Sequence, residues 1–245
     1  MTNLTIDSFC QSFFDLTESW SWEIQGFLDS NSYVHPIDSD TKVISTVFER
    51  MSAPAIRSIA KSYGYVVQLA NQTTYPDFTI TNPTTGHRIA LDIKTTYARS
   101  RMVFTLGGYN SFLRNNTKNI LFPYNSYADH WVLGFVYKQL AHYMDYDLES
   151  LPKAGEISCP YEVEAVFIRE KHELCGIRAG SGNTKNIGSF VGTNPKDFET
   201  KSGPFSEFSY GKAACDFYWA NYEIYCPNIN SKSELLSHKD FQQFI

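Results

Sequence analysis

The stretch Tyr75–Tyr97, YPDFTITNPTTGHRIALDIKTTY, contains two runs of strand character around a turn. The first run, Tyr75–Ile80, is followed by the turn-forming cluster Asn82–Gly86. From His87 onward apolar and polar residues alternate, as in a half-buried strand. One face of that second run is apolar and carries Ile89, Leu91 and Ile93. Together the two runs predict an antiparallel hairpin over residues 75–97.

The hairpin gathers three charged side chains. The period of two puts Asp92 and Lys94 on the same face of the second strand, opposite the apolar face. Pairing of the two strands is expected to place Asp77, on the first strand, beside Asp92 and Lys94. The same short acid-x-lysine pattern occurs at Asp40–Lys42 and Glu199–Lys201, but neither of these lies in an alternating strand preceded by Pro-Asp.

Two carboxylates a few ångströms apart repel each other, and a divalent cation relieves that repulsion. Oxygen ligands with open water positions suit Mg²⁺. A lysine beside the cation can orient or deprotonate an attacking water, or offset charge on a phosphate. This is the equipment for phosphodiester hydrolysis. The alternative is an exposed Asp–Lys pair on a sheet, because chance matches to so short a motif are common.

The segment before the hairpin reads as mainly helical. The acidic, aromatic residues 1–35 predict a helix and a connection, with a possible subunit contact. Asp40 is expected to cap a helix, and Ser52 to cap a second one with Pro54 in its first turn. Gly64 is expected to end that second helix.

The segment after the hairpin mixes loops, strands and helices. Its expected elements are a loop entering a short helix (104–120), a buried strand (131–140), a hairpin (163–168 with 174–177), a Gly/Asn loop (179–188) and a helix (213–225). The expected class is α/β, with a mixed central β-sheet flanked by helices. One domain spans 1–245, divided into an N-terminal segment (1–38), a core (39–189) and a C-terminal part (190–245).

The composition limits the class of protein and the compartment in which it is expected. The chain is 42% hydrophobic and 19% charged, which is typical of a globular protein. No apolar run approaches the roughly 18 residues that span a bilayer. Met1–Ser30 has no Lys or Arg, so no signal or transit peptide is expected. The five cysteines form no CxxC pair, which favours a reducing cytoplasm over a disulfide framework or a zinc site.

Charge is distributed unevenly along the chain. The net charge is −5 overall, made up of −7 over residues 1–40, +6 over 41–130 and −4 over 131–245. A basic middle segment can turn a positive face toward phosphate even in an acidic protein. Charge alone favours a mixed, solvated surface, so the case for a nucleic-acid partner depends on motifs.

Several longer runs carry a resemblance. They are Ser39-Asp-Thr-Lys-Val43, Phe48-Glu49, Tyr75-Pro-Asp-Phe-Thr79, Ile93-Lys-Thr-Thr-Tyr97, Phe104-Thr-Leu-Gly-Gly-Tyr109, Arg114-Asn-Asn-Thr-Lys-Asn-Ile120, Ala179-Gly-Ser-Gly-Asn-Thr184 and Asn186-Ile-Gly-Ser189. In these runs, and in their order, the chain resembles type II restriction endonucleases of the EcoRV family, within the PD-(D/E)xK nuclease superfamily. The resemblance implies a restriction-endonuclease-like fold and cleavage of double-stranded DNA.

The resemblance also implies roles for individual residues. Asp77 and Asp92 would bind the metal, Lys94 would be the catalytic lysine, and Glu49 would be an additional acid near the metal. Gly180, Ser181, Gly182, Asn183 and Thr184 would form the major-groove recognition loop, with Asn186 beside it. Further DNA contacts would come from Gln72 in a minor-groove loop and from Lys118, Thr95, Tyr97, Thr41, Ser45 and Ser111 near the backbone.

The resemblance implies partners and products as well. Mg²⁺ would be the cofactor, with Mn²⁺ able to substitute and Ca²⁺ supporting binding only. A homodimer would cut the palindrome GATATC bluntly, leaving 5′-phosphate and 3′-hydroxyl ends, and a host methyltransferase would protect the site. The chain departs from this pattern in residues 1–35, in a shorter 98–103 segment, in the threonines after Gln72 and beyond Ser189, where it has no basic tail.

Two other functions stay open on the sequence. One is a sequence-specific DNA-binding protein that does not cleave, which would bind DNA without product at any Mg²⁺ or Mn²⁺ level. The other is a structure-selective repair nuclease on the same fold, which would cut without a fixed sequence. HExxH and GxSxG are absent, so a zinc protease or a serine hydrolase is not favoured.

Overall fold

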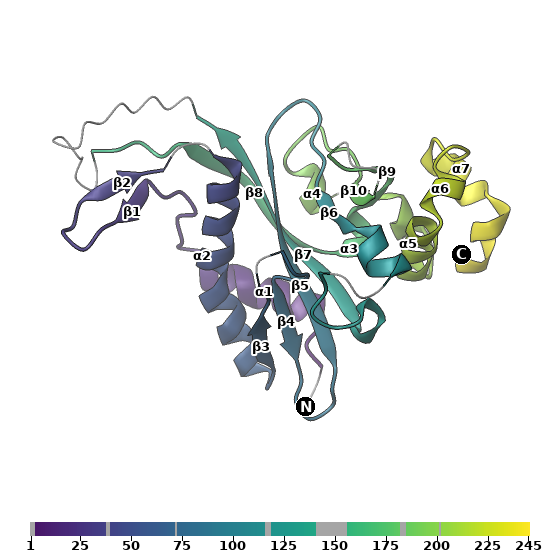
Figure 1. Cartoon of the computed structure of the whole chain (residues 1–245), viewed down its shortest axis with the longest axis horizontal. Coiled ribbons are helices and arrows are strands. Elements are labelled where there is room, and N and C mark those ends of the chain that lie inside the picture. The colour runs from purple at the N-terminus through teal and green to yellow at the C-terminus, as the bar shows by residue number, and fades with distance from the viewer. Residues whose placement is uncertain are drawn as a thin grey trace.

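A five-stranded mixed sheet forms the centre of the computed structural model, which describes residues 3–37, 40–71, 73–115, 119–140, 156–181, 185–200 and 202–245. Its strands, in spatial order, are β3 (Val66–Leu69), β4 (Phe78–Thr81), β5 (Arg88–Tyr97), β7 (Asp129–Gln139) and β8 (Tyr161–Glu170) (Figure 1). Only the β5–β7 pair is parallel; the other three pairs are antiparallel. The expected mixed sheet and its 75–97 hairpin are therefore confirmed.

The sheet separates two hydrophobic cores, as the alternation along β5 predicts. Ile89, Leu91 and Ile93 belong to the core under α1 (Ile6–Thr17) and α2 (Thr41–Ser62). Ala90, on the other face, belongs to a second core that is rich in aromatic rings. The helices of that side are α3 (Lys171–Leu174), α4 (Asp197–Thr200), α5 (Gly211–Ala220), α6 (Tyr222–Tyr225) and α7 (Lys232–Ser237).

Two smaller sheets extend the molecule on either side of the central one. The first contains β6 (Thr105–Gly108), β10 (Asn186–Ser189) and β9 (Cys175–Ala179), in that spatial order. The second is the ribbon of β1 (Gly26–Leu28) and β2 (Val34–Pro36), which lies beyond one end of α2 in Figure 1. Short 3-10 turns (124–126, 204–207, 239–244) and a π-helical turn (Asn110–Arg114) complete the described elements.

One helix, α2, replaces the two that the sequence predicts. Asp40 caps it as expected, accepting from the backbone N–H groups of Lys42 and Val43, and Gly64 follows its end at φ 77°. Ser52 is not a cap: its hydroxyl is buried and donates to the carbonyl oxygen of Phe48 at 2.7 Å. Pro54 lies inside the helix. The buried face continues on both sides of Pro54, so packing outweighs the single hydrogen bond that proline removes.

The predicted 163–177 hairpin is also wrong. β8 pairs with β7 in the central sheet, whereas β9 pairs with β10 in the small sheet, and α3 lies between them. Both strands contain the apolar runs expected of buried strands, so local pattern could not show that their partners differ. The buried strand at 131–140 and the helix at 213–225 are confirmed as β7 and α5–α6.

The segment 104–120 is more ordered than predicted. Its first part is the strand β6, and the π-helical turn follows directly. Gly107 has φ 99°, and a Cβ at this position would lie 2.2 Å from the ring of Phe112. Glycine is therefore required there for Phe112 to pack against the strand. Within the described residues, no helix combines the length and apolar character needed to cross a membrane.

Candidate active site

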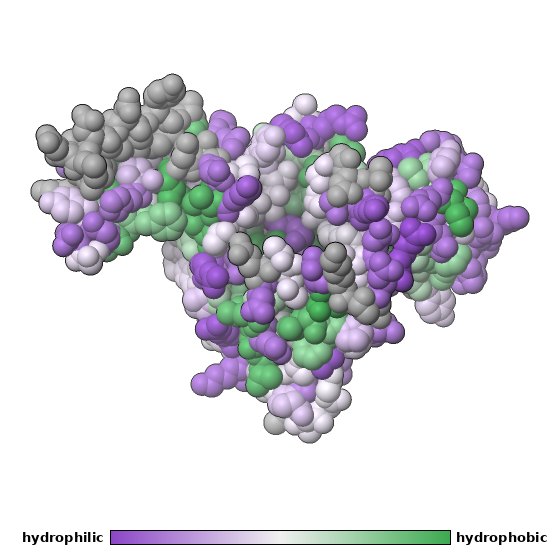
Figure 2. Space-filling model, in the orientation of Figure 1, coloured by the Kyte–Doolittle hydropathy of each residue, from purple (hydrophilic) through white to green (hydrophobic). Residues whose placement is uncertain are grey.

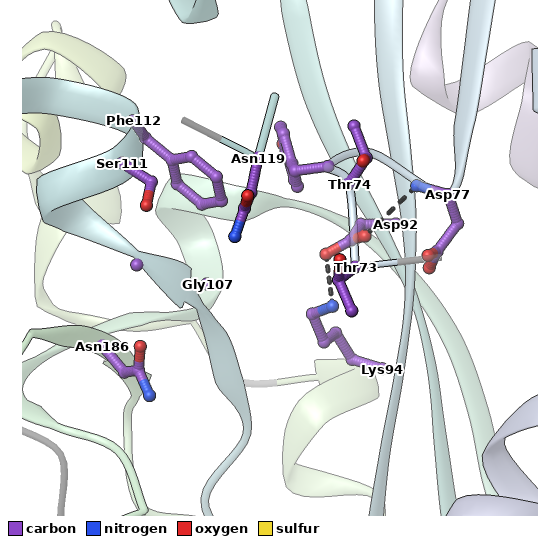
Figure 3. A pocket seen from close by; sticks show the side chains of 12 residues that line it. Thr73, Thr74, Asp77, Asp92, Lys94, Gly107, Ser111, Phe112, Asn119 and Asn186 are labelled. Carbon is purple, nitrogen blue, oxygen red and sulfur yellow. Dashed lines mark hydrogen bonds and ion pairs between the residues drawn. The ribbon is translucent and has the colours of Figure 1, made fainter. Parts of the chain in front are cut away.

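The β4–β5 hairpin brings Asp77 next to Asp92. Phe78 pairs with Leu91, so Asp77 stands at the start of β4 opposite Asp92 on β5. The backbone N–H of Asp77 donates to Asp92 Oδ1 at 3.4 Å, and Asp77 Oδ2 accepts from the backbone N–H of Ile93 at 2.7 Å. Each aspartate is thus held by the segment that carries the other, and Figure 3 shows the bond from Asp77 to Asp92.

Lys94 completes the group. Its Nζ forms an ion pair with Asp92 Oδ2, on the polar face of β5 that the alternation predicts. Asp92 is 4% exposed and the Lys94 side chain 23% exposed, so the pair is largely shielded from water. An ion pair at this depth interacts more strongly than one on the surface, and it fixes the ammonium at the edge of the cleft.

The two neighbouring carboxylates of the site favour the binding of a cation. Burial and the neighbouring charge of Asp92 raise the pKa of Asp77 to about 8. Burial lowers the pKa of Lys94, but the charges of Asp92 and Asp77 outweigh it, and the pKa is raised overall. Two buried carboxylates therefore share one ammonium. Excess negative charge on hard oxygen atoms is what a divalent cation such as Mg²⁺ binds.

An open, polar cleft of about 360 Å³ lies in front of these groups. Two residues from the predicted DNA-binding set, Ser111 and Asn186, line it together with Asp77, Asp92 and Lys94 (Figure 3). The remaining lining residues are Thr73, Thr74, Tyr75, Gly107, Gly108, Phe112 and Asn119. The cleft is thus built from the hairpin and the residues before it, the 105–114 segment, Asn119 and the start of β10.

Glu49 does not join the two aspartates. It lies on α2 with its side chain 30% exposed, and its carboxylate is 3.9 Å from Arg50. Its charge reaches Lys94 and contributes to the raised pKa of that lysine. Among the residues that the structure describes, no group of three or more His, Cys, Asp or Glu side chains is arranged to hold a metal ion.

Other predicted DNA-binding residues lie outside the lining of the cleft. Thr95 and Tyr97 follow Lys94 along β5, and the Tyr97 hydroxyl accepts from Arg99 at 3.2 Å. Thr41 and Ser45 lie at the start of α2, where the Ser45 hydroxyl donates to the carbonyl oxygen of Lys42.

The recognition loop is described only at its edges. Gly180 and Ser181 follow β9, and Ser181 has a left-handed backbone at φ 48°. The other five predicted DNA contacts lie outside the described residues: Gln72, Lys118, Gly182, Asn183 and Thr184.

Sequence reasoning missed Thr73 and Asn119. Both have left-handed backbones, at φ 69° and 59°, and both line the cleft. The carbonyl oxygen of Asn119 accepts from the backbone N–H of Tyr75 at 2.8 Å, so the two segments run side by side directly before Asp77. The resemblance singled out both segments, since Asn119 lies in the Arg114–Ile120 run and Thr73 directly follows Gln72, but nothing local indicates that they pair.

These features define the class of the protein. A buried acid–acid–lysine group on a hairpin of a mixed sheet, facing an open polar cleft, is the arrangement of a restriction-endonuclease-like nuclease. The sequence model of the family described as "Restriction endonuclease EcoRV" matches residues 18–245. The chain is also 42% identical over 216 residues to the type II restriction enzyme EcoRV of Escherichia coli, covering 84% of each chain.

The chain belongs to the EcoRV restriction endonuclease family. It is a type II site-specific deoxyribonuclease, and its family generally uses a divalent metal. The family match continues through residues 190–245, beyond the core that carried the resemblance in the sequence.

Proposed function

We propose that this enzyme hydrolyses double-stranded DNA at the palindrome GATATC in a Mg²⁺-dependent reaction. It cuts bluntly at the centre and leaves 5′-phosphate and 3′-hydroxyl ends. The observation that carries the chemistry is the Asp77–Asp92–Lys94 group at the wall of an open cleft. The retained Ala179–Thr184 motif and the 42% identity to EcoRV support the target sequence.

In this proposal Asp77 and Asp92 hold the cation and Glu49 is an additional acid that acts from α2. A bound divalent cation would withdraw charge from the phosphate and make a nearby water more acidic. Lys94 orients that water and offsets the charge that builds on the phosphate, because its ammonium is fixed by Asp92 at the cleft. Mn²⁺ substitutes for Mg²⁺, whereas Ca²⁺ supports DNA binding without cleavage.

DNA recognition is proposed to divide between the cleft and its rim. Ser111 and Asn186 contact DNA from the cleft wall, near the scissile phosphate. Gly180–Thr184 reads the major groove and Gln72 reads the minor groove. Thr41, Ser45, Thr95, Tyr97 and Lys118 contact the backbone and set the register, so they contribute affinity that depends on salt concentration.

A homodimer is proposed, because a palindrome presents two equivalent half-sites. An apolar groove of about 450 Å³ supports this proposal. Its lining consists of Ile24, Phe27, Val43, Val47 and Met51 together with Lys42, Thr46 and Arg50. Phe27 is 54% exposed and Leu28 69% exposed. The apolar surface of Figure 2 includes a patch near the β1–β2 ribbon. Residues 1–38, with the start of α2, would form the contact between subunits.

The proposed activity implies a protective partner enzyme in the host cell. An enzyme that cuts a fixed sequence endangers its own host, so a cognate DNA methyltransferase is proposed in the same cell. The five cysteines are free thiols in the structure, which is compatible with the proposed bacterial cytoplasm. Residues 39–189 are proposed as the catalytic and recognition core, with 190–245 as a supporting C-terminal part.

A plasmid digest tests the proposal. DNA of known sequence is incubated with Mg²⁺, Mn²⁺ or Ca²⁺, and the fragment ends are sequenced. Blunt Mg²⁺-dependent ends within GATATC are expected. Discrete ends elsewhere would retain the nuclease and reject the target. A smear would favour the repair nuclease, and DNA binding without product under every metal would favour the protein that binds without cleaving.

A further inference from the structure

The side chain of Lys171 is buried behind the cleft, and its ammonium forms no hydrogen bond with the residues that the structure describes. Lys171 begins α3 directly after β8, and it is only 4% exposed. An ammonium group buried without a hydrogen bond is costly, so folded proteins retain one only where something compensates.

Three aromatic rings surround the Lys171 ammonium. Its Nζ lies 4.4 Å from the ring centre of Phe112, 4.9 Å from that of Tyr75 and 5.0 Å from that of Tyr124. Aromatic faces carry partial negative charge and attract cations at these distances. We call these three rings the aromatic cage. They also pack on one another, with Tyr75 and Phe112 centroids 4.4 Å apart.

Two rings of the aromatic cage are also the wall of the active site. Tyr75 and Phe112 line the cleft together with Asp77, Asp92 and Lys94. Tyr75 precedes Asp77 by two residues, so its position helps to set that of the aspartate. The Lys171 ammonium therefore lies behind the wall that faces DNA, and within electrostatic range of Asp92.

The other charged group facing Lys171 does not form an ion pair with it. Asp216, on α5, lies near enough for the two charges to interact, but no contact between them falls within ion-pair distance. The Asp216 carboxylate is instead hydrogen-bonded to the hydroxyl of Tyr124. Burial lowers the pKa of Lys171, and the charges of Asp92 and Asp216 oppose that shift, so the ammonium interacts with the active-site carboxylate as well as with Asp216.

We propose that Lys171 is a positioning residue of the active site. Its ammonium holds Tyr75 and Phe112 in place, and its charge limits the negative potential at the Asp77–Asp92 pair. In the low dielectric behind the cleft, that charge weakens cation binding and favours the approach of the DNA phosphate. This inference rests on the proposed function, since it concerns the same carboxylates.

Lys171→Met tests the inference because methionine retains most of the volume and removes the charge. Mn²⁺ binding to the DNA-free protein is followed by electron paramagnetic resonance. We expect tighter Mn²⁺ binding in Lys171→Met, on the order of threefold to tenfold, with a lower kcat at saturating metal. The thermal midpoint should be equal or higher, since an unpaired buried charge is gone. Lys171→Arg should restore both quantities toward the wild-type values.

Lys212→Met is the matched control. Lys212 also lies near Asp216, and its Nζ donates to the carbonyl oxygen of Ala128, outside the cleft. This variant loses one positive charge but should keep the wild-type Mn²⁺ affinity. If both variants bind Mn²⁺ more tightly to the same extent, a general charge effect explains the result and the inference is overturned.

Two further outcomes are informative. Wild-type Mn²⁺ affinity and kcat in a folded Lys171→Met variant would overturn the inference and leave the proposed function intact. Wild-type protein that neither binds Mn²⁺ nor cleaves DNA would instead reject the proposed function, and the inference with it. If Lys171→Met does not fold, Lys171→Gln also removes the charge, retains a polar end group and should shift Mn²⁺ affinity in the same direction.

Discussion

The carboxylate of Asp77 accepts a hydrogen bond from the backbone N–H of Ile93 at 2.7 Å. Asp77 is therefore attached to the strand that carries Asp92 and Lys94, on either side of Ile93. A side-chain acceptor of this kind keeps the two carboxylates at a fixed separation before any cation arrives. Pre-organised sites of this kind lose little entropy when they bind a cation.

Asp92→Ala should abolish cleavage and leave DNA binding in place. The change removes one carboxylate and the partner of Lys94, while the fold keeps its apolar face on β5. Cleavage is measured on a GATATC duplex, and binding by gel shift in Ca²⁺. Glu199→Ala is a matched control, because Glu199–Lys201 repeats the short motif away from the hairpin. Full cleavage by Asp92→Ala would reject the assignment of the site.

Without divalent metal, Asp77 should make the protein less stable as pH rises. Its pKa is about 8 in the folded protein and 3.8 ordinarily, so the folded state binds the proton more tightly. Its contribution to stability is fully present below about pH 4 and is lost as pH rises through 8.

Asp77→Asn lacks this titration, which makes it the reference. Between pH 5 and pH 8 the free energy of unfolding, measured in urea, should fall more for the wild type than for the variant, because titratable groups away from the site are the same in both. An equal fall in the two proteins would contradict the predicted pKa shift. Added Ca²⁺ should reduce the wild-type fall, since a cation favours the deprotonated carboxylate.

Gly107→Ala should damage both stability and cleavage. The backbone at φ 99° costs a non-glycine residue about 1–3 kcal/mol, and the new Cβ would meet the ring of Phe112. Displacement of Phe112 would move the cleft wall next to Ser111. Chemical unfolding and cleavage rates measure the two effects. Gly86→Ala has a similar positive φ of 74° in open space, so it isolates the strain of the backbone from the clash.

Phe27→Asp should weaken the proposed dimer. Phe27 is 54% exposed at the edge of the apolar groove, and a charge there would be unfavourable in a buried interface. Analytical ultracentrifugation should show a shift toward monomer, and double-strand cleavage should fall more than single-strand nicking. Ile224→Asp changes a similarly exposed apolar residue on α6 and should leave the oligomeric state unchanged. A Phe27→Asp protein that sediments like the wild type would exclude this surface.

Local pattern was sufficient for the catalytic hairpin and insufficient for the cleft. The alternation along residues 87–97 reports burial on one face, and the turn at 82–86 fixes the register, so Asp77, Asp92 and Lys94 could be placed together. The rest of the cleft comes from distant segments around Thr73, Asn119 and Asn186. Their association depends on tertiary packing, which leaves no periodic trace.

The two wrong elements share a physical reason. Ser52 and Pro54 have strong local preferences for a helix start, but the apolar face of α2 continues past them and the core holds a single helix. The strands β8 and β9 are adjacent in sequence, but each finds a different partner. In both cases burial over many residues outweighs a signal carried by one or two.

Because the central sheet separates two cores, the two faces of β5 are under different constraints. Ile89, Leu91 and Ile93 pack under α1 and α2, whereas Ala90, Asp92 and Lys94 lie on the opposite face. Natural variation in relatives should therefore alternate in kind from one position to the next. In relatives, Ile89, Leu91 and Ile93 should be replaced only by apolar residues of similar volume. Asp92 and Lys94 should be unchanged.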